Sequence, residues 1–85
     1  MKLNKEILKK QIIYRSMHRG TKEMDLLLGS FVKKYIEEFN INELKELENL
    51  LFIEDEVIYK WYVKKISDEI IPKTKISTLL KKFKL

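Results

Sequence analysis

The chain has no cysteine, one proline and two glycines among its 85 residues. Without cysteine it can form no disulfide and offers no thiolate to a metal or a substrate. So little proline and glycine leaves few residues suited to tight turns, which favours helices joined by short connections. The lack of cysteine also fits a reducing compartment.

Long apolar runs are absent as well. No apolar run approaches the roughly 20 residues that a membrane-spanning helix needs. The first residues, MKLNKEILKKQ, are too polar for the apolar segment of a secretory signal peptide. We therefore expect a cytoplasmic protein with no membrane insertion.

The composition is that of a small folded domain. Hydrophobic residues make up 45% of the chain and charged residues 36%, which predicts a single globular domain over residues 1–85. At this size the core is small, and an internal enzyme pocket is not expected. The net charge of +5 permits an anionic partner without requiring one.

Apolar residues that recur every three or four positions predict helices throughout the chain. The first helix spans about residues 5–17, and the second begins at Gly20 or Thr21 and ends near Phe39. We expect Gly20 to adopt the left-handed conformation that ends many helices. Gly29 lies inside the second helix and predicts a close crossing with another helix.

The second half of the chain predicts three more helices. The third is capped by Asn40 or Asn42, with Glu43 in capping-box position after Asn40. Asp55 is the expected N-cap of the fourth, and Pro72 is expected in the first turn of the fifth, after a connection over residues 64–73. The predicted fold is all-α, a compact bundle of about five short helices.

Residues 14–25, YRSMHRGTKEMD, hold both arginines, the only histidine and one of the two glycines. One interpretation is a helix–helix corner, with Gly20 as C-cap and Glu23 as an acid in the first turn of the next helix. The other is a contact surface. An exposed Arg19 beside Gly20 would let a partner's backbone approach closely while the guanidinium makes forked hydrogen bonds.

The sequence predicts no catalytic or metal site. His18 could act as a base for Ser16 or Ser30, but no third group is placed to orient it. Glu23 and Asp25, two apart on a helix, point about 200° apart and cannot share a proton. A metal site would need three or four ligands, and the single histidine has no partner at ligand spacing.

Two segments resemble a known family. RSMHRGTKEMDLLLGSF resembles the Arg-Gly-x-x-Glu signature of the succinate dehydrogenase FAD assembly factor family. LLFIEDEVIYKWYV resembles that family's second signature, in which two leucines precede an aspartate and an aromatic-x-Trp group. The resemblance covers about residues 12–63, with a weaker match in the last helix.

The resemblance implies a five-helix bundle without catalytic activity of its own. The expected function is that of an assembly chaperone, which binds the flavoprotein subunit of succinate dehydrogenase or fumarate reductase and promotes covalent FAD attachment. FAD is then the cofactor attached to the partner and is not bound stably by this chain. We expect a monomer that binds neither nucleic acid nor metal.

The resemblance also implies which residues meet the flavoprotein. Arg19 and Gly20 would form the central contact, and Glu23 would hold or extend it. The other partner-binding residues expected from the same turn are Tyr14, Arg15, His18 and Asp25. In the second segment, Trp61 is expected to pack in the core of the fourth helix.

The alternative is a small basic helical domain that binds nucleic acid. Basic residues cluster around the first turn, and KTKISTLLKKFKL makes the last helix basic. This alternative predicts binding that weakens steeply with salt. However, glutamates interleave with the lysines over much of the chain, which favours solvated helix faces.

Overall fold

The computed structural model describes residues 4–66 and 70–85, and within these ranges it contains helices and no strand. The α-helices are α1 (Lys5–Met17), α2 (Lys22–Tyr35), α3 (Ile41–Leu51), α4 (Asp55–Val63) and α5 (Lys75–Lys82). A short 3-10 helix, η1 (Ile36–Glu38), extends α2. The all-α prediction with five helices is confirmed. None of the described helices is long and apolar enough to span a bilayer.

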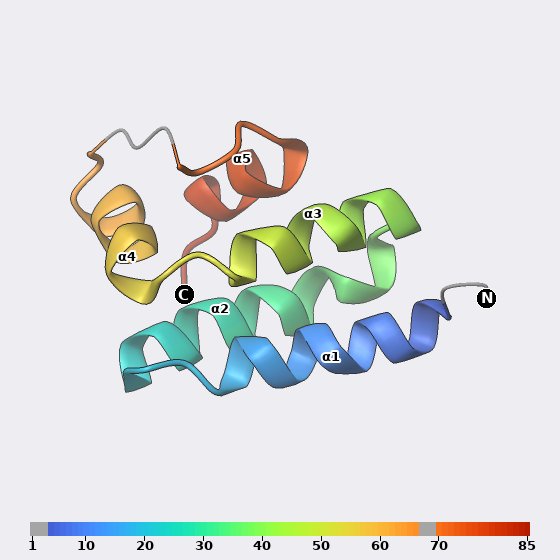
Figure 1. The fold of residues 1–85 in the computed structure, drawn as a ribbon. Coiled ribbons are helices and arrows are strands. Elements are labelled where there is room, and N and C mark those ends of the chain that lie inside the picture. The colour runs from blue at the N-terminus through green and yellow to red at the C-terminus, as the bar shows by residue number, and fades with distance from the viewer. Residues whose placement is uncertain (1–3, 67–69) are drawn as a thin grey trace.

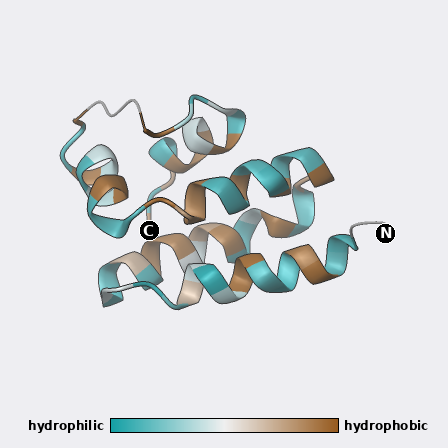
Figure 2. Ribbon diagram, in the orientation of Figure 1, coloured by the Kyte–Doolittle hydropathy of each residue, from teal (hydrophilic) through white to brown (hydrophobic). Residues whose placement is uncertain are grey.

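The helices form two groups (Figure 1). The antiparallel pair α1 and α2 packs against α3 mainly through α1, and α5 lies against the opposite side of α3. Helix α4 lies beyond the C-terminal end of α3. Each helix carries apolar residues on one part of its surface and polar residues on the rest (Figure 2). Burying the apolar parts against one another produces a single core, which holds the bundle together.

An aromatic cluster joins α2 to the C-terminal end of the chain. Phe31 is fully buried, and its ring centroid lies 5.2 Å from Tyr35 and 5.4 Å from Phe83. Rings at these separations attract one another beyond the area they bury. Phe83, just after α5, is therefore held against α2.

Side-chain caps set the starts of α2 and α3, as the sequence predicts. The Thr21 hydroxyl accepts the backbone N–H of Met24 at 3.2 Å. Asn40 and Glu43 form the reciprocal capping box, with distances of 2.8 and 2.9 Å. The backbone N–H of Asn40 and an ion pair with Lys75 lower the pKa of the Glu43 carboxyl.

Gly29 lies at the crossing of α1 and α2, which confirms the close crossing predicted there. A Cβ added to Gly29 would lie 3.5 Å from Cγ of Met17 and 3.8 Å from the backbone oxygen of Ser16. These are ordinary van der Waals distances. The crossing is close, yet it has room for an alanine.

The prediction for the start of the fifth helix is wrong. Pro72 is not in the first turn of α5, because the helix begins at Lys75 after a capping box between Thr74 and Ser77. Pro72 instead supplies a carbonyl that accepts the Ser77 hydroxyl at 2.6 Å. The predicted connection over residues 64–73 includes residues 67–69, which lie outside the described residues.

Gly20 is not a left-handed C-cap. The C-cap of α1 is His18, and neither glycine has a positive φ. The described residue with positive φ is Lys65, at 58°, just after α4. Glycine at position 20 is therefore required for a reason other than its backbone conformation.

Candidate functional site

The Arg19 side chain turns inward, between the end of α3 and the start of α4. Its Nε donates to Oδ1 of Asp55 at 2.7 Å. Its two terminal nitrogens donate to the backbone oxygens of Leu51, at 2.6 Å, and Ile53, at 2.9 Å. Only 9% of the side chain is exposed. The expectation of an exposed guanidinium is wrong, because the protein's own acceptors fill its fork.

Asp55 holds both residues of the Arg-Gly pair. While Oδ1 accepts from Arg19, Oδ2 accepts the backbone N–H of Gly20 at 2.7 Å. Asp55 is the first residue of α4, and the N-cap position belongs to Glu54. The prediction that Asp55 is the N-cap is therefore wrong. Its carboxylate is used by the turn, 36 residues earlier in the chain.

A second carboxylate completes the arrangement. Oδ1 of Asp25, in the first turn of α2, accepts the backbone N–H of Arg19 at 2.5 Å. Two successive backbone N–H groups are thus bound by carboxylates from two different helices. Hydrogen bonds to an ionised acceptor are about twice as strong as neutral ones, so this turn is held firmly.

Close approach to Asp55 explains the glycine. A Cβ added to Gly20 would lie 3.3 Å from Oδ2 of Asp55, tighter than most real Cβ contacts. A side chain at this position would push the carboxylate away from the N–H it accepts. Gly20 itself is exposed, so its backbone remains accessible from outside.

Exposed aromatic and basic side chains flank the turn. The rings of Tyr14 and His18 stack with centroids 4.0 Å apart, and Nδ1 of His18 lies 2.8 Å from the Tyr14 backbone oxygen. A carbonyl only accepts, so this contact requires the proton on Nδ1. The Arg15 guanidinium lies over the exposed ring of Phe52, 4.4 Å from its centroid.

The predicted site residues therefore divide into two sets. Arg19 and Asp25 form the internal support of the turn, whereas Gly20 and Glu23 are exposed, as are Tyr14, Arg15 and His18. Within the described ranges, the Glu23 carboxylate makes no hydrogen bond or ion pair. Phe52 was not among the predicted partner-binding residues, and the structure links it to the turn through the cation–π contact with Arg15.

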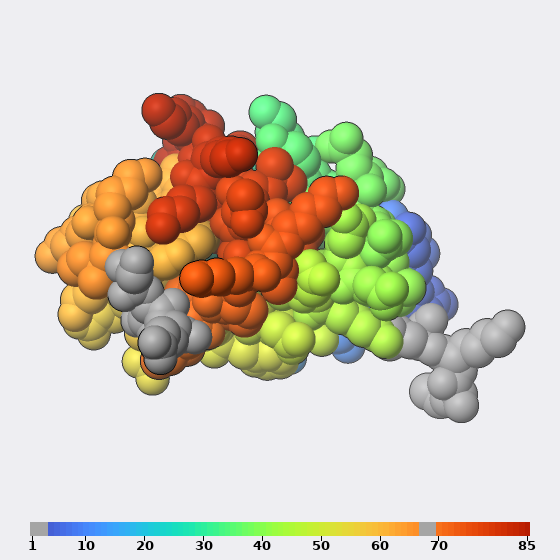
Figure 3. All heavy atoms as spheres, turned by 90° about the horizontal axis from the view of Figure 1, so that it is seen from above, coloured from blue at the N-terminus to red at the C-terminus, as the bar shows by residue number. Residues whose placement is uncertain are grey.

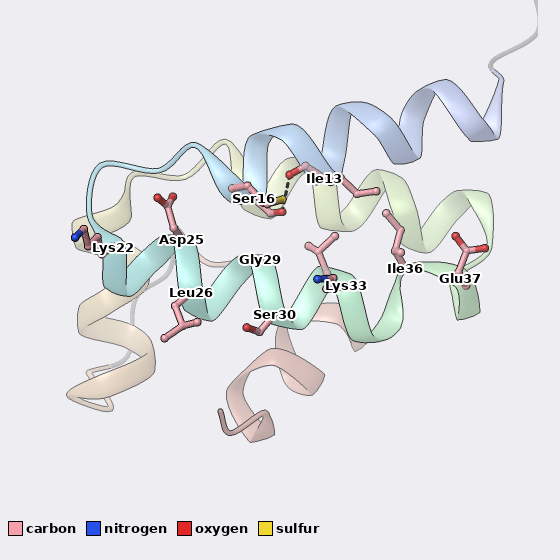
Figure 4. A pocket seen from close by; sticks show the side chains of 12 residues that line it. Ile13, Ser16, Lys22, Asp25, Leu26, Gly29, Ser30, Lys33, Ile36 and Glu37 are labelled. Atoms are coloured by element: carbon pink, nitrogen blue, oxygen red, sulfur yellow. Dashed lines mark hydrogen bonds between the residues drawn. The ribbon is translucent and has the colours of Figure 1, made fainter.

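A groove of about 790 Å³ runs along α2 from this turn (Figure 4). Exposed Met17 and Leu26 line it near the turn, and Ile36 lines its far end. Lys22 and Asp25 mark one end, while Lys33 and Glu37 mark the other. The lining is largely apolar, with charges of both signs at each end. It is a surface groove rather than an internal pocket.

The described residues contain no cluster of three potential metal ligands. Nor does the structure pair His18 with a serine. Ser16 is fully buried, and its hydroxyl donates to the backbone oxygen of Ile13 at 2.8 Å. His18 is exposed and contacts Tyr14 instead.

Residues 10–84 match the Sdh5 family, described as the flavinator of succinate dehydrogenase. The chain belongs to this family. It is 44% identical over 77 residues to a protein of Scheffersomyces stipitis named succinate dehydrogenase assembly factor 2, mitochondrial. That alignment covers 89% of this chain and 52% of the relative. A protein of Saccharomyces cerevisiae with the same name is 40% identical over 62 residues, which cover 73% of this chain and 38% of the relative.

The chain thus spans about half or less of the length of these relatives. No solved structure matches it. The relatives are named mitochondrial, which contradicts the cytoplasmic location expected from the sequence. That expectation was wrong because neither a lack of cysteine nor a polar first segment separates the cytoplasm from other reducing compartments.

Proposed function

We propose that this chain is a non-catalytic assembly factor that binds the flavoprotein subunit of succinate dehydrogenase, or of fumarate reductase, and promotes its covalent attachment to FAD. Membership of the Sdh5 family supports this role. The docking surface proposed is the turn over residues 14–25. The chain acts as a monomer, and FAD is attached to the partner.

The proposal rests on the two hydrogen bonds that the Asp55 carboxylate accepts, one from the Arg19 side chain and one from the Gly20 backbone. One carboxylate fixes the Arg19 side chain inside the protein and orients the Gly20 backbone outside. A turn supported in this way loses little conformational freedom on docking, so less binding free energy is spent on ordering it. Arg19, Asp25 and Asp55 are therefore positioning residues.

We assign the contact with the partner to the exposed residues of the turn. Gly20 lets another backbone approach, and the stacked rings of Tyr14 and His18 offer a flat, partly polar surface beside it. Arg15 and Glu23 supply charges of opposite sign on the same turn. Rigid aromatic residues with arginine are the composition that protein interfaces favour at their centres.

We infer that the factor promotes FAD attachment by binding some arrangements of the flavoprotein more tightly than others. A factor that binds the attachment-competent arrangement of the flavoprotein more tightly than the other arrangements increases the population of that arrangement. The groove along α2 bears Asp25 and Glu37 as well as Lys22 and Lys33, so its balanced charge does not favour the dianionic pyrophosphate of FAD. The factor therefore acts on the partner rather than carrying FAD.

Co-expression tests the proposal. The flavoprotein subunit is produced with and without this chain, and covalent flavin is read as fluorescence in a denaturing gel. Fluorescence should depend on the chain and should fall with Tyr14→Ala, which removes an exposed ring beside the turn. Ile7→Ala is the matched control, because it removes a large exposed apolar side chain from α1, outside both signature segments. Equal fluorescence with and without the chain would reject the assembly role, and equal loss in both variants would reject the surface.

A further inference from the structure

Positive charge is concentrated in the last third of the sequence. Residues 57–85 contain eight lysines and two acidic residues, Asp68 and Glu69. The remaining residues, 1–56, contain ten basic and eleven acidic residues, so their net charge is −1 and that of residues 57–85 is +6. The basic character of the chain therefore belongs to α4, α5 and the segments beside them.

The fold brings much of this charge together. The Tyr62 hydroxyl donates to the backbone oxygen of Phe83, and the Lys81 ammonium lies 5.1 Å from the centre of the Trp61 ring. The Lys34 ammonium, from the end of α2, lies 5.9 Å from the centre of the Phe83 ring. Figures 1 and 3 show α4 and α5 side by side, away from the N-terminus. The Lys65 ammonium lies 6.0 Å from the centre of the Tyr62 ring. The lysine pole, as we call it, comprises these three lysines and three that adjoin Lys65, Lys81 or Phe83 in sequence: Lys34, Lys64, Lys65, Lys81, Lys82 and Lys84.

The lysine pole carries more positive charge than is needed to balance the C-terminal ends of the helices beside it. The C-terminal ends of α4 and α5 each carry about half a negative charge, so roughly one positive charge would balance both. The pole has six lysines, and within residues 4–66 and 70–85 none of the six forms an ion pair with a carboxylate. By contrast, Lys60 and Lys75 are paired with Glu56 and Glu43.

Exposed apolar side chains adjoin several of these lysines in the sequence. The sequence VKKI at the end of α4 and KFKL at the end of the chain repeat the same mixture of lysine and apolar residues. Val63, Ile66 and Leu85 are 49%, 52% and 69% exposed. Each is next to a lysine in the chain. The aliphatic stems of those lysines can therefore follow the apolar side chains into a less polar environment while the ammonium groups stay in water.

We propose that the lysine pole binds the surface of a membrane that contains anionic lipids. Lysine, a strongly hydrated point charge, suits delocalised attraction to headgroups, whereas forked recognition of particular carboxylates is typical of arginine. The pole contains no arginine. Its apolar side chains are few and surround the lysines, which suits shallow insertion at the headgroup boundary. Because the pole uses other residues than the proposed docking turn, a membrane-bound factor keeps that turn available.

Vesicle flotation tests this inference. The intact protein should float with vesicles of mixed phosphatidylglycerol and phosphatidylcholine, and not with vesicles of phosphatidylcholine alone. Lys64→Gln with Lys84→Gln should weaken binding about tenfold, because each lysine near an anionic surface contributes measurably to affinity. Lys5→Gln with Lys10→Gln removes the same charge from exposed positions of α1 and should change binding far less. Equal losses in the two double variants would overturn the pole as the site.

A further double variant distinguishes a membrane from other anionic surfaces. Ile66→Ser with Leu85→Ser leaves the charge unchanged and should weaken vesicle binding several-fold, since two apolar side chains no longer insert. Unchanged binding in this variant would overturn the membrane proposal and leave attraction to any polyanion. Binding to duplex RNA without binding to anionic vesicles would overturn it in favour of nucleic acid.

Discussion

Replacing Asp55 should reveal how much the turn depends on α4. Asp55→Ala removes two charge-assisted hydrogen bonds of 2.7 Å and leaves the Arg19 guanidinium without its counter-charge. Such bonds contribute about 1.5–3 kcal/mol each. The Asp55 side chain is 21% exposed, so water replaces part of what is lost. We expect the free energy of unfolding to fall by about 3 kcal/mol.

The size of this loss decides what can be measured. A chain of this length has a free energy of unfolding of about 4–13 kcal/mol, so the variant should still be mostly folded at 25 °C. The midpoint of thermal unfolding should fall by about 12–24 °C. Circular dichroism at 222 nm, with heat and with urea, measures both quantities. Asp55→Asn keeps the shape but loses the charge and one acceptor, and it should cost about 2 kcal/mol.

Glu56→Ala is the matched control. Glu56 is the other acid in the first turn of α4, is exposed, and pairs with Lys60. Its removal should cost less than about 0.5 kcal/mol. Both acids interact with the same helix dipole, so the difference between the variants isolates the contacts with the turn. Equal losses in Asp55→Ala and Glu56→Ala would refute the reasoning.

Four further changes should have smaller effects, each read from thermal or urea unfolding. Gly29→Ala should stabilise the protein by about 0.5–1 kcal/mol, because its Cβ fits the α1–α2 crossing. Gly20→Ala should destabilise the protein, because its Cβ crowds Asp55. A change of stability in the same direction for both variants would contradict the Cβ distances at the two glycines. Lys65→Gly should raise stability by up to about 1 kcal/mol, because Lys65 has φ of 58°, a backbone conformation that glycine adopts more easily. A loss of stability would show that the contacts of the Lys65 side chain outweigh this backbone strain. The lowered pKa of Glu43 stabilises the fold above its ordinary pKa of 4.5, and this contribution disappears as pH falls through the lower value in the folded protein. Glu43→Gln should therefore reduce stability near neutral pH and flatten its acid dependence; parallel pH curves would reject this.

The sequence predicted helix positions well where local chemistry determines them. Thr21 and Asn40 cap their helices with their own side chains, within three residues of the N–H groups they accept. Apolar spacing located the buried sides of α2 and α3 for the same reason. Pro72 was misplaced because proline tolerates a first helical turn but does not require one, and the Thr74–Ser77 box starts the helix later.

The support of the turn could not be predicted in the same way. Asp55 stands at the start of a helix, where a carboxylate is a good N-cap, and nothing near it in sequence indicates Arg19. The same contact explains why the predicted exposure of Arg19 and the predicted conformation of Gly20 were wrong. The resemblance predicted a role for residues of the turn, but only the fold shows that Arg19 supports it from inside. The partner-binding role of the exposed residues remains a prediction.

The bond from Arg19 to Asp55 also affects when the turn becomes ordered during synthesis. Residues 5–35, which form α1 and α2, leave the ribosome well before Asp55 does. Until α4 emerges and packs, the guanidinium and the Gly20 N–H lack the Asp55 carboxylate, so Asp25 alone supplies a carboxylate to the turn of a nascent chain. Only a chain completed through α4 can offer the turn in its final form. A chain that ends before α4 should therefore hold this turn less firmly, even though its α1–α2 hairpin contains every residue of the turn.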